Sequence, residues 1–165
     1  MAKAPRDCPC FSGERAASCC SPLHRGEREA ASPEELMRSR YAAFALGLGE
    51  YLVRTLAADH PDRGMPPMAL VQELRRAHER QRFLGLSILD ARVDEGGDEG
   101  EVLFHARIFE KGVDHSFAEL SRFVREAGAW RYAAGTVIAT AELPADVAAL
   151  TPDDVRRSAA SRDAK

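Results

Sequence analysis

The sequence lacks a long apolar run and lacks a large excess of charge of either sign. No stretch of about 18 apolar residues is present to span a bilayer. The first residues lead into cysteines, where a signal peptide would need an apolar stretch. We therefore expect a cytoplasmic protein with no membrane partner. The formal net charge of −3 gives no support to nucleic-acid binding, because it would weakly repel a phosphate backbone.

Cysteine is absent from residues 21–165, and all four cysteines fall in one short N-terminal stretch. They are Cys8, Cys10, Cys19 and Cys20. In a reducing cytosol, cysteines clustered in this way are more typical of a metal site than of disulfides. Four thiolates complete a tetrahedral zinc site, so we predict one zinc ion bound by these four residues. A disulfide and idle surface thiols are the alternatives.

This zinc site is expected to be structural. Four protein ligands leave no open position for water or substrate, so Lewis-acid catalysis is not expected there. The segment has almost no apolar residues, and metal binding can supply its folding free energy. His24 follows Cys20 by four residues and is an alternative fourth ligand, although an exposed loop histidine is the simpler interpretation.

The stretch "CPCFSGERAASCC" resembles the SEC-C motif, a small zinc-binding element known from the C-terminal tail of the SecA preprotein translocase motor. The resemblance implies the same four cysteine ligands. Phe11 stands where the motif has its first glycine, at a position whose backbone conformation favours glycine. The motif's loop is usually rich in lysine, but here it offers only Arg15 against Glu14. A partner that reads positive charge would therefore bind more weakly.

Residues 32–82 have the pattern of three helices. Ser32 and Pro33 form a helix start, with a capping serine followed by proline at the first helical position. One apolar stripe then follows at helical spacing, made of Met37, Tyr41, Phe44 and Leu48. Glycines at 47 and 49 are expected to end this helix. A second short helix is predicted around residues 51–56, and a third over 67–82.

Residues 83–139 have the pattern of four strands. The predicted strands are 83–93, 101–109, 115–124 and 129–139. The connections after the second and third strands are too short for a parallel crossover, so those neighbours must pair antiparallel. Helices followed by such a meander predict an α+β fold in which the helices cover one face of a curved sheet.

The stretches "LMRSRYAAFALGLGEYLVRTLAADHP", "HARIFEKG" and "ELSRFVREAGAWRYAAG" resemble the bacterial YchJ family over residues 7–140. In that family a SEC-C motif precedes a cone-shaped domain of the nuclear transport factor two-like fold. The expected organisation is a zinc segment at 1–32, the cone domain at 33–141 and a tail at 142–165. The tail has no cysteine, so it carries no second SEC-C motif, and we expect a short helix or disorder there.

Several polar or amphipathic side chains are candidates for lining a cavity in the cone. His105 and Arg107 share one strand face, and Glu119 is expected opposite one of them. The candidates are Tyr41, His105, Arg107, Glu119, Arg122 and Trp130. An acid, a histidine and a tyrosine permit acid/base chemistry. The simpler interpretation is a cross-strand ion pair with a packed tyrosine and tryptophan, and no catalytic residue is assigned because no nucleophile and base have a diagnostic spacing.

Two further side chains have open roles. Arg40 is expected to be a solvated arginine whose stem lies on the core, with a contact to the zinc segment as the alternative. His60 is expected to cap the second helix.

Three functions remain compatible with the sequence. The preferred one is a zinc-binding adaptor with a protein partner, such as export or ribosomal machinery, bound through the zinc segment. The alternative is a small-molecule-binding or enzymatic cone that uses a cavity near Tyr41 and Trp130, with binding preferred to catalysis. RNA binding is the third and has little charge to support it. The sequence does not decide the oligomeric state.

Overall fold

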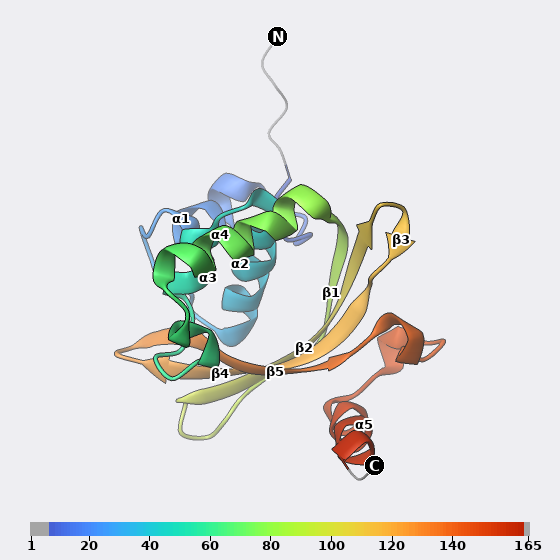
Figure 1. Ribbon diagram of the computed structural model, residues 1–165. Helices are drawn as coiled ribbons and strands as arrows, with labels where there is room; N and C mark the ends of the chain where they lie inside the picture. The colour runs from blue at the N-terminus through green and yellow to red at the C-terminus, as the bar shows by residue number, and fades with distance from the viewer. Residues whose placement is uncertain (1–6, 164–165) are drawn as a thin grey trace.

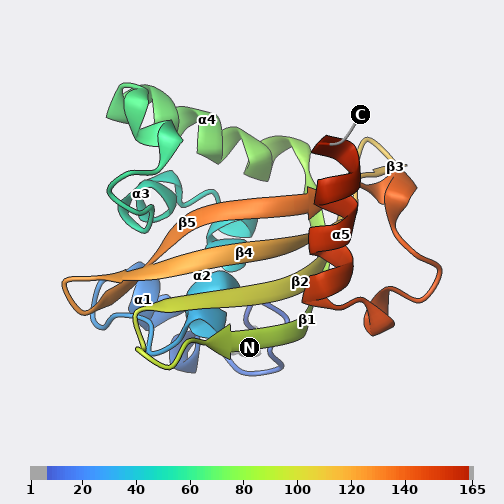
Figure 2. The ribbon, with the colours of Figure 1, turned by 90° about the horizontal axis from the view of Figure 1, so that it is seen from below.

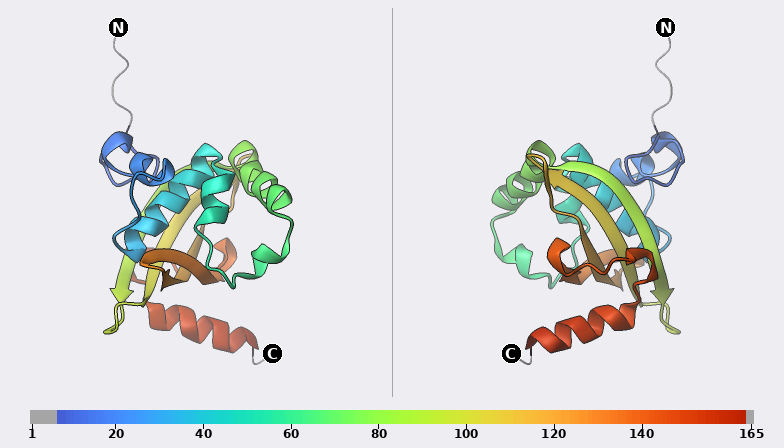
Figure 3. Two further views of the ribbon diagram at one scale, coloured as in Figure 1. Left: turned by 90° about the vertical axis from the view of Figure 1, so that its left-hand side faces the viewer. Right: turned by 90° about the vertical axis from the view of Figure 1, so that its right-hand side faces the viewer.

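A curved antiparallel sheet with helices on both sides forms the body of the protein in the computed structural model, which describes residues 7–163 (Figure 1). The helices that precede the sheet in the chain lie inside its curve, and the final helix lies on the outer side. The N-terminal segment that carries the cysteines lies beside α2 (Figure 3). This arrangement confirms the predicted α+β fold.

The inner layer contains the helices that the spacing of apolar residues predicts. These are α2 (Pro33–Leu46), α3 (Gly49–Arg54) and α4 (Pro67–Arg80). Three short elements were not predicted: η1 (Ala16–Ser18) and α1 (Ser21–His24) in the cysteine segment, and η2 (Pro61–Gly64) before α4. Ser32 caps α2 by accepting a hydrogen bond from the backbone N–H of Glu35 at 3.1 Å. The helix ends at Gly47, whose φ of +73° is the left-handed conformation that glycine adopts without a steric cost.

The sheet is a meander with one short addition. Its strands are β1 (Arg82–Val93), β2 (Glu99–Glu110), β3 (Val113–Asp114), β4 (Phe117–Glu126) and β5 (Ala129–Ile138). The order across the sheet is β1-β2-β4-β5, all pairs are antiparallel, and β3 pairs only with the end of β2. Residues with positive φ at Lys111 and Gly112, and again at Ala127 and Gly128, make the two tight turns.

The two faces of the sheet pack against different partners. Phe104, Ala106 and Ile108 of β2 point inward and join the core made with α2 and α3. Leu103 of β2 points outward and joins a smaller core with α5. This alternation follows from the period of two along a strand.

The C-terminal tail forms a helix rather than a disordered end. After η3 (Thr140–Glu142) and η4 (Val147–Ala149), α5 (Pro152–Asp163) crosses the outer face of the strands (Figure 2). Val155 is fully buried there and Leu150 is 9% exposed, so these two apolar side chains anchor the tail. Among residues 7–163, no helix has both the length and the apolar character needed to cross a membrane.

Candidate metal centre and interior cavity

The four cysteines converge on one point. Their sulfur atoms all lie within 4.8 Å of one another, and Cys8, Cys10 and Cys20 are buried. The Sγ atom of Cys19 lies 3.6 Å from that of Cys10 and 3.8 Å from that of Cys20. A tetrahedral zinc ion with bonds of about 2.3 Å to sulfur needs edges of roughly 3.8 Å. The donor set and its spacing therefore fit a closed four-thiolate metal site.

The thiols differ in how readily they lose a proton before a metal binds. Hydrogen bonds from Cys20 and Cys8 lower the pKa of Cys10. Burial raises the pKa of Cys19 to about 11. A metal ion must displace these protons, so its apparent affinity falls as the pH falls. All four ligand positions come from the protein, which suits a structural role.

Phe11 follows the first pair of cysteines in a conformation that disfavours a side chain. Its φ is +61°, in the left-handed region where glycine is favoured. The side chain is 48% exposed, and its ring meets that of Tyr41 edge-on at 6.1 Å. This position is where the SEC-C motif has glycine, and here a phenylalanine adopts a backbone conformation that favours glycine.

Hydrogen bonds attach the metal segment to the helical layer. Arg38, not Arg40, reaches the cysteines: its Nη1 donates to the carbonyl oxygen of Cys10 at 3.1 Å. Arg54 of α3 donates to the carbonyl oxygen of Leu23 at 3.3 Å. The Leu23 side chain is 1% exposed and belongs to the inner core. The segment is therefore anchored by side-chain packing as well as by polar contacts.

His24 is neither an exposed loop residue nor part of the cysteine cluster. It lies in α1, where its Nε2 donates to the carbonyl oxygen of Ser39 at 2.8 Å. Its ring packs edge-on against Tyr51 at 4.8 Å, and burial lowers the pKa of His24. The prediction of an exposed histidine is wrong because α1 docks on α2 and covers the ring.

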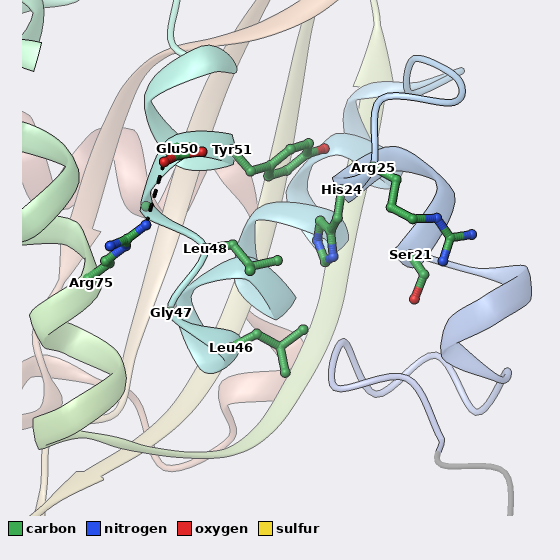
Figure 4. A pocket seen from close by; sticks show the side chains of 10 residues that line it. Ser21, His24, Arg25, Leu46, Gly47, Leu48, Glu50, Tyr51 and Arg75 are labelled. Atoms are coloured by element: carbon green, nitrogen blue, oxygen red, sulfur yellow. Dashed lines mark ion pairs between the residues drawn. The ribbon is translucent and has the colours of Figure 1, made fainter. Parts of the chain in front are cut away.

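A cleft of about 380 Å³ lies between the metal segment and the helical layer (Figure 4). His24 and Arg25 line one side, and the turn from α2 to α3 lines the other. Arg75 reaches in from α4 and pairs with Glu50 at 3.6 Å. Arg25 pairs with Glu27 at 2.9 Å. The charges of this cleft are thus neutralised by exposed neighbours.

A second cavity, of about 260 Å³, lies inside the cone between the helices and the concave face of the sheet. Most of its wall is apolar, and four phenylalanines supply aromatic surface: Phe44, Phe83, Phe104 and Phe117. Its polar lining residues are Arg40, Tyr41, His60, Asp62, Gln81, Glu119 and Tyr132. We call this space the cone cavity.

Glu119 forms a polar cluster on the sheet side of the cone cavity. Its Oε2 accepts a hydrogen bond from the hydroxyl of Tyr132 at 3.1 Å and another from the hydroxyl of Ser121. Burial raises the pKa of Glu119, and these two hydrogen bonds only partly offset that effect. The ring of Tyr132 lies 5.6 Å from that of His60.

Arg40 lies in the core and is not the solvated arginine that the sequence predicts. It is 6% exposed, and its Nη1 donates to the carbonyl oxygen of Leu52 at 2.8 Å and to the hydroxyl of Thr55 at 2.6 Å. Its guanidinium carbon lies 4.8 Å from the centre of the Tyr132 ring. Burial lowers the pKa of Arg40 to about 10, which leaves it a cation at neutral pH.

The structure brings only two of the predicted cavity residues together. Tyr41 and Glu119 line the cone cavity, and the Tyr41 hydroxyl donates to the carbonyl oxygen of Gly85 at 2.9 Å. His105 and Arg107 point to the outer face of the sheet, and Ala118, not Glu119, lies opposite His105. The predicted cross-strand ion pair of Arg107 with Glu119 is therefore wrong, because Glu119 lies opposite Phe104, three residues from Arg107.

Arg122 and Trp130 also lie outside the cone cavity. Arg122 pairs with Glu99 at 3.7 Å on the surface. Trp130 is 2% exposed and packs in the inner core, with the guanidinium of Arg125 at 5.0 Å from its ring. The aromatic residue of β5 that does line the cavity is Tyr132, two residues further along the same strand face.

His60 is likewise placed differently from the prediction. Instead of ending α3, it caps η2 by accepting a hydrogen bond from the backbone N–H of Asp62 at 3.1 Å. Together with Arg40 and Tyr132 it is a cavity residue that the sequence analysis missed. Helical spacing held a signal for Arg40, which lies three residues after Met37 and four before Phe44 on the buried stripe.

Comparison with known proteins agrees with this architecture. Residues 32–135 match the family described as "YchJ, middle NTF2-like domain". A SEC-C motif containing protein from Rhodopseudomonas palustris is 37% identical, with a TM-score of 0.69 over 79% of this chain and 97% of its own. A SEC-C motif containing protein from Psychrobacter arcticus is 24% identical and has the same fold, with a TM-score of 0.64 over 86% of this chain and 89% of its own. On these grounds the chain belongs to the YchJ family.

Proposed function

We propose that this protein is a small-molecule-binding cone in which a zinc ion, held by the four cysteines, has a structural role. The observation that carries the proposal is the cone cavity, which combines aromatic walls with a buried arginine and a half-buried glutamate. Apolar pockets with a few convergent polar groups are the usual form of ligand sites. The proposal includes a cytoplasmic setting, where the reducing environment favours thiolate ligands over disulfides.

Filling the cavity tests this proposal. Ala77 of α4 lines the cone cavity, and Ala77→Trp would place an indole in it. A neutral aromatic probe, 3-phenylpropanamide, titrated into ¹⁵N-labelled, zinc-loaded protein should shift amide signals of the cavity residues. The shifts should disappear in Ala77→Trp and persist in Arg76→Trp, the neighbouring exposed position on the same helix. Absence of shifts in the wild-type protein with both this amide and the corresponding carboxylate, 3-phenylpropanoate, would refute the proposal.

An adaptor role through the metal segment is the second candidate, with export or ribosomal machinery as the partner. Phe11 favours it, because its strained phenyl group lies beside the metal site and is half exposed, so one side of the ring is accessible to a partner. Co-sedimentation with purified ribosomes should be lost in Phe11→Ser while the metal content stays at one ion per chain. Equal co-sedimentation of the wild-type protein and Phe11→Ser would show that Phe11 is not the contact. Absence of co-sedimentation of the wild-type protein would show that the ribosome is not the partner.

A further inference from the structure

Arg40 is a buried cation with unused hydrogen-bond donors. Both of its protein hydrogen bonds use Nη1, which leaves Nε and Nη2 without a protein acceptor among residues 7–163. In that part of the chain, Trp130 Nε1 is the one side-chain polar atom that is both sealed from solvent and unpartnered. The free nitrogens of Arg40 must therefore touch accessible space. Since Arg40 is 6% exposed and forms part of the cavity wall, that space is the cone cavity.

No carboxylate contacts Arg40 among residues 7–163, although Glu119 and Asp62 interact with it electrostatically at longer range. Within residues 7–163 the guanidinium forms hydrogen bonds but no ion pair. Glu119 shares the cavity, yet its Oε2 is occupied by Tyr132 and Ser121, and burial raises the pKa of its carboxyl group. The Asp62 carboxylate is half exposed and lies beside His60 instead. A buried cation without an anion in contact is costly, and a bound anion would offset that cost.

The rest of the cone cavity sets the shape of such an anion. A guanidinium edge with Nε and Nη2 free matches the two oxygens of a planar carboxylate. The opposite walls are the four phenylalanine rings, which favour an apolar or aromatic body. The volume of about 260 Å³ is below the range of roughly 300–1,000 Å³ that is usual for drug-sized ligands. The ligand is therefore small.

We propose that the cone cavity binds a small monocarboxylate with an apolar body, whose two oxygens accept hydrogen bonds from Nε and Nη2 of Arg40. This inference rests on the proposed ligand-binding function and adds the chemical class of the ligand. The hydroxyl of Tyr132 and the carboxyl group of Glu119 form the polar surroundings of the bound carboxylate, and the phenylalanines contact its body.

A matched pair of probes tests the charge requirement. 3-Phenylpropanoate and 3-phenylpropanamide have nearly the same shape, but only the first is an anion. Each is titrated into ¹⁵N-labelled, zinc-loaded protein, and amide shifts of cavity residues give the dissociation constants. A charge-assisted hydrogen-bonded pair should make the carboxylate bind roughly 10- to 100-fold more tightly than the amide. Arg40→Met should remove this difference, and Arg107→Met, the same change on the outer face, should preserve it.

The outcomes separate the two proposals. If both probes bind equally, the carboxylate inference is overturned while the ligand-binding function stands. If neither probe shifts a cavity residue, both are overturned. Arg40 also donates hydrogen bonds to Leu52 and Thr55 at the end of α3, so Arg40→Met can destabilise the fold as well as remove the charge. The Arg40 Nε–H signal of the wild-type protein covers that case: it should move with the carboxylate and stay in place with the amide, and the reverse result would refute the assignment.

Discussion

Removing the metal should unfold the N-terminal segment and weaken the cone without unfolding it. Detachment of the segment exposes Leu23, whose burial stabilises by about 2–3 kcal/mol. It also breaks hydrogen bonds from Arg38 to Cys10, from His24 to Ser39 and from Arg54 to Leu23, each with a net contribution of about 1 kcal/mol. The expected loss is roughly 5–6 kcal/mol, which for a chain of this length lowers the melting temperature by about 10–24 °C.

The cone should survive this loss because its own core remains. Trp130, Phe123 and Leu52 are fully buried in packing that is centred on the sheet, α2 and α3. Calorimetry with and without a strong chelator, in the presence of a reductant, gives the shift in melting temperature. Near-ultraviolet circular dichroism of Trp130 shows whether the cone keeps its packing. In metal-bound protein, Leu23→Ala isolates the apolar contribution and should cost about 2–5 kcal/mol.

Two results would refute this reasoning. If chelation left the melting temperature unchanged, the contacts of Leu23 and the three hydrogen bonds would contribute nothing to the cone. If chelation abolished cooperative unfolding at room temperature, residues 1–32 and 33–141 would be one unit, and the predicted boundary between them would be wrong. The intermediate result, a cooperative transition at a lower temperature, is the expected one.

Two smaller changes test the strained and buried residues. In a chelator competition, Phe11→Gly should bind metal about fivefold more tightly than Phe11→Ala. Both variants lose the ring, but only glycine relieves a positive φ that costs roughly 1 kcal/mol. Equal affinities would show that the loop adapts at no cost. Burial raises the pKa of Glu119 in the fold above its value in the unfolded chain, so ionisation begins in the unfolded chain and stability falls as the pH rises between the two values. Glu119→Gln should remove this pH-dependent loss of stability in denaturant titrations across pH 4 to 8. A pH profile identical to that of the wild-type protein would contradict a raised pKa of Glu119.

Local patterns predicted the helical layer well because the causes are local. Ser32, Pro33 and Gly47 delimit α2 through capping and backbone conformation, which are properties of neighbouring residues. The same spacing places Arg40 on the buried stripe, but arginine is usually solvated, so its side chain was predicted to reach solvent. What permits its burial is a pair of acceptors, Leu52 and Thr55, that lie 12 and 15 residues further along the chain. No sequence pattern links these positions.

Strand faces were predictable, but the register between strands was not. The period of two placed His105 and Arg107 on one face of β2 and separated Glu119 from Arg122 on β4. Pairing the strands by one residue differently, however, puts Ala118 opposite His105 and turns Glu119 inward. For a similar reason the sequence left the choice between a short helix and disorder in the tail open. Val155 is a weak local signal, and its stability comes from outward-facing residues such as Leu103 and Leu120 on distant strands.

One helix connects the metal centre with the cone cavity. On α2, Arg38 donates to the loop that contains Cys10, and Tyr41 carries the ring against which Phe11 packs. Tyr41 also lines the cavity and is tied to Gly85 of β1 through its hydroxyl. Loss of the metal would release Phe11 from one wall of the cavity while Gly85 still holds Tyr41 from the other side. Tyr41 is therefore the side chain that contacts both sites, and the order of its ring is the property to follow in a test of coupling between metal content and ligand binding.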